Sequence, residues 1–133
     1  ESVASRIHVA AVSMEDREVN ATVVNAVQRV SSVVTQRSLI EAFGLTVAEA
    51  MWKKAPVVAS AVGGIRDQID DGVDGVLVDP TDGVAWAEAV RDLLLFPERA
   101  QEMGLAAHES VRREFLSNRH LQDLLQIVAD LVG

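Results

Sequence analysis

The stretch from Ser38 to Lys53 reads SLIEAFGLTVAEAMWK, and the rest of the chain can be interpreted outward from it. It places two glutamates, Glu41 and Glu49, on either side of a turn that contains a glycine. Thr46 precedes Glu49 by three residues, which is the spacing of a capping box and predicts a helix with Thr46 as its N-cap. The free N–H groups of a helix start, with the positive end of the helix dipole, suit an anionic or hydroxyl-rich ligand.

Short apolar runs on both sides of this stretch predict strands that alternate with helices. The expected strands are Ile7 to Val12, Ser32 to Thr35, Val57 to Ser60 and Val76 to Val78. Alternating strands and helices form a parallel sheet, and ligands of such sheets bind beyond the carboxyl ends of the strands. The loops Ser38 to Thr46 and Ala61 to Ile65 follow successive strands, so they can flank one crevice. The predicted fold class is therefore α/β, a partial doubly wound, Rossmann-like sheet with extra C-terminal helices.

Apolar residues at helical spacing predict which side chains of the other helices face the core. These helices are expected after Ser13, after the run Asp79-Pro80-Thr81-Asp82, from Pro97 onward and from about Asn118 to Leu131. The side chains predicted to be inward are Val19, Val23, Ala26, Val27, Val30, Trp86, Val90, Leu93, Leu94, Ala100, Met103, Ala107, Val111, Leu121, Leu124, Leu125 and Val128.

Composition sets limits on the class of protein. With 133 residues, 49% of them hydrophobic, we expect residues 1–133 to form a single ordered domain. The chain contains no cysteine, which excludes disulfides, thiolate metal sites and a cysteine nucleophile, and weakly favours a cytoplasmic location. A net charge of −8 disfavours nucleic acid as a partner, and no apolar run is long enough to cross a membrane.

The segment from Glu41 to Ala50, EAFGLTVAEA, resembles the E-x7-E signature of the retaining glycosyltransferases of family four. These are nucleotide-sugar enzymes of the GT-B architecture. Ala61 to Asp67 and Asp71 to Pro80 follow the same family pattern at the expected distance. Together with Val34 to Leu39 and Glu49 to Lys53, they make the chain most similar to the trehalose synthase branch, whose members join a nucleotide-activated glucose to glucose with retention.

The resemblance implies a role for each residue of this edge. Glu41 would be the catalytic carboxylate, facing the donor sugar and supporting the positive charge that develops at its anomeric carbon. Glu49 would accept hydrogen bonds from the ribose hydroxyls, as an ionised carboxylate can. The residues expected to bind the sugar and diphosphate through their backbone are Phe43, Gly44, Leu45 and Thr46. Further loop contacts are expected from Ser38, Gly63 and Gly64.

The resemblance also implies the partners of the chain. The co-substrate would be UDP- or ADP-glucose, with no cofactor and no metal, because N–H groups and cations would meet the phosphates. Ile40 and Ala42 stand where the trehalose synthase branch usually has Arg and Gly. The earlier strands that carry the family's phosphate-binding arginine and lysine, and the N-terminal acceptor domain, have no counterpart here. We therefore expect a truncated donor-binding domain that does not catalyse transfer alone and that self-associates through an exposed sheet edge.

Two other classes of protein remain open. A non-catalytic α/β fragment or interaction module would keep the fold without binding a donor. A response-regulator-like module would need a phosphorylatable aspartate at the end of its first strand, and no such strand end is seen in the sequence. A capping role alone would explain Glu49, and core packing would explain Trp52 and Trp86 without any sugar contact. Binding of UDP, ADP or their glucose conjugates separates these possibilities.

Overall fold

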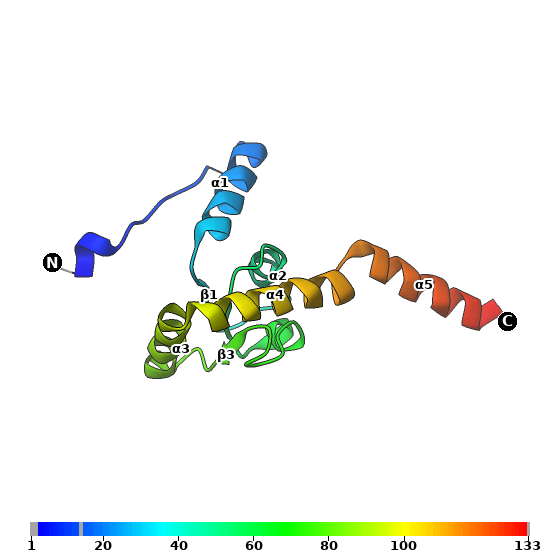
Figure 1. The fold of residues 1–133 in the computed structure, drawn as a ribbon. Coiled ribbons are helices and arrows are strands. Elements are labelled where there is room, and N and C mark those ends of the chain that lie inside the picture. The colour runs from blue at the N-terminus through cyan, green and yellow to red at the C-terminus, as the bar shows by residue number, and fades with distance from the viewer. Residues whose placement is uncertain (1–2, 14, 133) are drawn as a thin grey trace.

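The computed structural model describes residues 3–13 and 15–132 and has a small α/β body from which two helices project (Figure 1). In chain order, its elements are η1 (Val3–Arg6), α1 (Arg17–Val30), β1 (Val34–Gln36), α2 (Leu45–Trp52), β2 (Val57–Ser60), η2 (Gly63–Asp67), β3 (Val76–Val78), α3 (Gly83–Leu95), α4 (Pro97–Glu114) and α5 (Ser117–Val132). The predicted α/β class is confirmed. The projecting helices are α1 and α5, which leave the body in different directions.

The sheet consists of three parallel strands in the order β1, β2, β3. The central strand, β2, is buried along its whole length. Its register places Val57 opposite Val34 of β1, and Val58 opposite Val76 of β3. Because successive side chains of a strand point to opposite faces, Val57 and Ala59 enter one core while Val58 enters the other.

Helices cover both faces of this sheet. α2 packs on one face, α3 packs on the other, and the long helix α4 contributes to both cores. The buried helical residues are Val47, Ala50, Met51, Ala107 and Val111 in the first core, and Trp86, Leu93, Ala100 and Met103 in the second. The inward positions predicted for α4 are confirmed, as are Trp86 and Leu93 of α3. The prediction for Leu94 is wrong, since its side chain is 55% exposed.

α2 and α4 meet closely at the C-terminal end of α2. Gly104 of α4 is buried, and a Cβ atom built on it would lie only 2.2 Å from the carbonyl oxygen of Lys54. His108 donates from Nδ1 to the carbonyl oxygen of Trp52 at 2.6 Å, and the two rings stack with their centroids 4.4 Å apart. The last carbonyls of a helix have no hydrogen-bond partner inside that helix, so His108 of α4 supplies a donor to the carbonyl at the end of α2. Trp52 remains 41% exposed, so it is only partly a core residue.

The N-terminal segment differs from the prediction. Residues 7–12 do not form a strand, because none of the described strands pairs with their N–H and C=O groups, and Val9 is 94% exposed. The predicted cap of the first helix is also wrong. α1 is capped by Asp16, whose Oδ1 accepts the N–H groups of Glu18 and Val19 at 3.0 Å, and Ser13 lies outside the helix.

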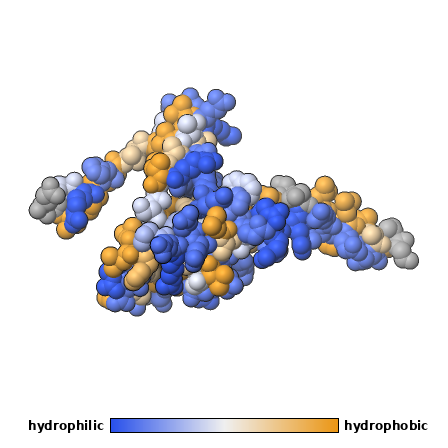
Figure 2. Space-filling model, viewed as in Figure 1, coloured by the Kyte–Doolittle hydropathy of each residue, from blue (hydrophilic) through white to orange (hydrophobic). Residues whose placement is uncertain are grey.

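The apolar faces of α1 and α5 are exposed, although the sequence predicts them in the core. Val27 is 56% exposed and Leu125 is 60% exposed, because both helices project away from the sheet (Figures 1 and 2). The other side chains that were predicted to be inward and are exposed are Val19, Val23, Ala26, Val30, Leu121, Leu124 and Val128. The spacing identifies the apolar face of a helix correctly, but it does not say what covers that face. None of the described helices is both long and apolar enough to cross a membrane.

A groove of about 410 Å³ lies along the free side of β1. Val23 and Val27 of α1 form one part of its lining, and Val33, Thr35 and Thr46 form another. Val34 donates its N–H toward β2, to the carbonyl of Pro56 at 2.9 Å. Since the N–H groups of a strand alternate in direction, the N–H of Thr35 points to the free side. Within the described residues, the outward N–H of Thr35 therefore has no partner, and apolar side chains surround it.

Self-association through this edge is the expected result in solution. The measurement is the mass of the purified chain by light scattering. Thr35→Pro removes the outward N–H without touching the ladder to β2, so it should lower the mass toward that of a monomer, whereas Thr35→Val should not. A monomeric wild-type chain would contradict the prediction, and so would a dimer that Thr35→Pro leaves intact.

Candidate functional site

The two loops predicted at the ligand edge lie together beyond the carboxyl ends of β1 and β2. The N–H of Gly64 donates to the carbonyl oxygen of Glu41 at 3.3 Å. Nε2 of Gln68 donates to the carbonyl oxygen of Phe43. A Cβ atom on Gly63 would lie 1.8 Å from the carbonyl oxygen of Glu41, so the loops approach this closely only because a glycine stands there. The structure thus brings the two loops together as predicted.

The start of α2 differs from the predicted capping box. Its N-cap is Gly44, with φ of 66°, and no side chain caps the helix. The carbonyl of Gly44 already accepts the N–H of Val47 at 3.0 Å, so Thr46 lies inside the first turn and cannot be the cap. A left-handed N-cap suits glycine, and a Cβ atom there would also lie 2.8 Å from Cγ1 of Ile65. Glu49 therefore does not cap this helix.

The N–H groups at the start of α2 are open. Those of Leu45 and Thr46 have no hydrogen-bond acceptor among the described residues, as expected for a first helical turn. Leu45 is 69% exposed, and Thr46 is exposed as well. The positive end of the helix dipole lies at the same place. This turn can therefore donate to an anionic or hydroxyl-rich ligand.

Glu49 lies on the exposed face of α2. Val47, Ala50 and Met51 turn to the core, while Thr46 and Glu49, three residues apart, share the opposite face. Within the part of the chain that the structure describes, the Glu49 carboxylate has neither a hydrogen bond nor an ion pair. Its oxygens are free to accept hydrogen bonds from a ligand at the helix start.

Glu41 is held by a short chain of hydrogen bonds. Nε2 of Gln36, the last residue of β1, donates to Oγ of Ser38 at 2.9 Å, and this hydroxyl donates to Oε2 of Glu41 at 3.3 Å. All three side chains are half-buried. Ser38 thus lies beside Glu41, and its contact with a ligand stays a prediction. Gln36 was not predicted, although a polar residue at the end of a strand was a usable signal.

Two arginines at the same edge were also missed. Nε of Arg37 donates to the carbonyl of Pro80 at 2.9 Å, and Nε of Arg66 donates at 2.6 Å to the carbonyl of the residue after β2. The hydroxyl and N–H of Thr81 donate to Asp79 and lower the pKa of its carboxyl, and the charge of Arg66 acts in the same direction. Arg37 thus links the loops beyond β1 and β3, while the hydrogen bond of Arg66 stays within the loop beyond β2. Each arginine lies in the segment that follows a predicted strand, and this position could have identified both as residues of the candidate site.

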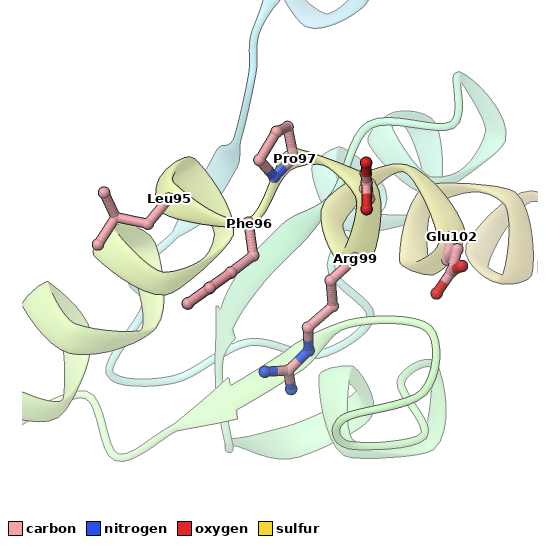
Figure 3. A pocket seen from close by; sticks show the side chains of 6 residues that line it. Leu95, Phe96, Pro97, Arg99 and Glu102 are labelled. Carbon is pink, nitrogen blue, oxygen red and sulfur yellow. The ribbon is translucent and has the colours of Figure 1, made fainter.

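A separate cavity of about 640 Å³ lies at the junction of α3 and α4 (Figure 3). Its lining comes from Leu95, Phe96, Pro97, Glu98, Arg99 and Glu102. None of the predicted site residues contributes to it. A neighbouring cavity is lined by Ser32 and Pro56, which precede β1 and β2, so this surface lies toward the opposite edge of the sheet.

No group of three or more potential metal-ligating side chains comes together within residues 3–13 and 15–132. The predicted site residues are instead backbone N–H donors and two separate carboxylates. The prediction that the donor is bound without a metal stays a prediction.

Comparison with known proteins places these features in a family. Residues 17–110 match the family model described as glycosyl transferases group 1. The trehalose synthase of Pyrococcus horikoshii is 49% identical over 115 residues, which are 86% of this chain and 27% of that protein. The chain thus spans about a quarter of the length of this relative.

Solved structures agree on the fold. The sucrose-phosphate synthase of Thermosynechococcus elongatus superposes with a TM-score of 0.72 at 31% identity, over 86% of this chain and 28% of that one. The Anabaena protein HepE, solved in complex with UDP-glucose, superposes with a TM-score of 0.70 at 21% identity, over 80% of this chain and 30% of that one. The resemblance predicted from the segment between Glu41 and Ala50 is confirmed, and the chain belongs to the group 1 glycosyl transferases.

Proposed function

We propose that the chain is the donor-binding segment of a retaining glycosyltransferase whose donor is a nucleotide-activated glucose, used in trehalose synthesis. The observation that carries this proposal is the open start of α2, flanked by Glu41 in the preceding loop and by Glu49 on its exposed face. The trehalose synthase relative supports the choice of sugar, and the UDP-glucose complex of HepE supports a nucleotide sugar. The acceptor site would belong to another part of a longer protein.

The diphosphate of the donor would lie at the start of α2. N–H groups from Phe43 to Thr46 and the helix dipole would face its oxygens. When the bond to the sugar breaks, negative charge grows on the diphosphate, and donors already fixed in direction stabilise that charge without reorganising. The net charge of −8 makes backbone donors more suitable here than a basic patch.

Glu41 would face the sugar. In retaining transfer the anomeric carbon becomes positively charged as the leaving group departs, and a fixed carboxylate nearby lowers the free energy of that state. The Ser38 hydroxyl, 3.3 Å from Oε2 of Glu41, restrains the orientation of that carboxylate. Gly63 and Gly64, the first two residues of η2, would shape the wall of the crevice next to it, where they approach the backbone of Glu41 and Ala42.

Glu49→Gln is expected to weaken binding of the nucleoside diphosphate about tenfold, because a charged acceptor for the ribose hydroxyls becomes a neutral one. Calorimetric titration with UDP or ADP provides the measurement. The corresponding 2′,3′-dideoxy nucleotide should bind the variant and the wild type equally, since it lacks both hydroxyls. Glu88→Gln, the same change in an exposed glutamate of α3, is the matched control. Unchanged affinity in Glu49→Gln would remove Glu49 from the site.

The proposal itself is tested by titrating the wild-type chain with UDP, ADP, UDP-glucose and ADP-glucose. We expect the chain to bind the nucleoside diphosphate and the nucleoside diphosphate glucose of one base, and to bind the free nucleoside of that base more weakly. The absence of binding at millimolar concentration would favour the other class considered, a non-catalytic α/β module that keeps the fold without a donor.

A further inference from the structure

Gln68 is a buried side chain aimed at the candidate site. It follows η2 directly and is only 3% exposed. Its Nε2 donates to the carbonyl oxygen of Phe43, 25 residues earlier in the chain. A carbonyl oxygen can only accept, so the amide nitrogen must be the atom that faces it. Its Oε1 is buried without a hydrogen-bond partner among the described residues, so the amide is kept there despite a cost in free energy.

The bond to Phe43 fixes the direction of a backbone donor. In a trans peptide the C=O of one residue and the N–H of the next point in opposite directions, and the described residues contain no cis peptide bond. Because the carbonyl of Phe43 points to Gln68, the N–H of Gly44 points away from η2. The carbonyl of Glu41 points to Gly64 in the same way, so the N–H of Ala42 also points away from η2. The N–H groups of Ala42 and Gly44 therefore lie on the same side of the turn, away from η2.

This peptide needs such a restraint. A flip of the peptide between Phe43 and Gly44 changes φ of Gly44, and glycine accepts both signs of φ with little cost. Gly44 has no side chain that would resist the flip. Ile65 packs beside Gly44, but an apolar side chain cannot distinguish a C=O from an N–H. The direction of the Gly44 N–H therefore depends on the hydrogen bond from Gln68.

We propose that Gln68 is a positioning residue: it holds the Phe43–Gly44 peptide so that the Gly44 N–H faces the diphosphate of the donor. The identity of that ligand rests on the function proposed above. Gln68 itself does not touch the donor. The amide side chain acts through the backbone of the turn, and the phosphate-dependent part of the binding free energy is the part that it controls.

The test variant is Gln68→Met, which keeps the length of the side chain but cannot donate. It is expected to raise the Kd of UDP, or of ADP if the wild type selects that base, about tenfold. The Kd of the matching nucleoside, uridine or adenosine, should not change. The matched control is Gln28→Met, which replaces another buried glutamine. That residue is hydrogen-bonded to Lys53 at the opposite end of α2, so its loss should lower stability without changing the Kd of UDP. An unchanged Kd of UDP in folded Gln68→Met, or an equal loss for UDP and uridine, would overturn the proposal.

A second measurement does not depend on a ligand. In ¹H–¹⁵N spectra of the free chain, Gln68→Met should shift the amide resonance of Gly44, whereas Gln28→Met should leave it in place. If the wild type binds no nucleoside diphosphate, the proposed function fails while this spectrum still decides the role of Gln68. A Gly44 resonance that does not move in Gln68→Met would overturn that role.

Discussion

Gly63→Ala is expected to lower the free energy of unfolding by about 4 kcal/mol and to abolish binding of the nucleoside diphosphate. Two costs combine at this position. Gly63 has φ of 46°, in the left-handed region, and a side chain there costs roughly 1–2 kcal/mol. Its Cβ atom would also lie 1.8 Å from the backbone oxygen of Glu41, which cannot rotate away as a side chain can. The loop that carries Glu41 would have to move.

Urea denaturation followed by circular dichroism measures the loss of stability, and calorimetry measures binding. Gly72→Ala is the matched control, since Gly72 also has positive φ, 78°, but nothing lies within 4 Å of a Cβ atom there. It should cost only the strain, roughly 1–2 kcal/mol, and leave binding intact. Equal losses of stability in the two variants would show that the contact between the loops is not as close as described.

Gly104→Ala is expected to destabilise the chain by about 3 kcal/mol, although alanine is the better helix former by roughly 1 kcal/mol. The reason is the approach of α4 to the end of α2, where a Cβ atom would lie 2.2 Å from the carbonyl oxygen of Lys54. Separation of the two helices would also lengthen the hydrogen bond from His108 to Trp52.

Thermal and urea denaturation again provide the measurement. Gly83→Ala, at the first residue of α3, is the control because its nearest neighbour would be the Arg37 side chain at 4.0 Å. That variant should be neutral or slightly stabilising. A Gly104→Ala variant as stable as the wild type would contradict the described packing of α2 on α4.

Local patterns were enough for the body of the fold but not for its ends. The strand Val57–Ser60 and the start of α4 at Pro97 follow from apolar runs and helix-start chemistry that act within a few residues. The segment from Ile7 to Val12 has the composition of a strand, yet a strand needs a neighbour, and the sequence does not state whether one is present. The exposed stripe of α5, which contains Leu125, is the same kind of error for a helix.

Some features of the candidate site were predictable from the sequence and others were not. The order of strands and loops predicted which loops lie together at the candidate site. The resemblance added separate roles for Glu41 and Glu49, which stay predictions. The N-cap of α2 could not be chosen correctly, because Thr46 is a good capping residue by itself. The residues that contact the left-handed turn at Gly44, Ile65 and Gln68, lie more than twenty positions away in the sequence. Contacts of this range cannot be derived from spacing in one sequence.

The most direct test of the proposed donor site is a ¹H–¹⁵N NMR titration of the labelled wild-type chain with UDP-glucose and ADP-glucose. We expect one of them to shift the backbone amides from Ala42 to Thr46, with those of Leu95 and Phe96 at the α3–α4 cavity unchanged. Shifts confined to that cavity, or no shifts at millimolar donor, would contradict the assignment of a donor site to the start of α2.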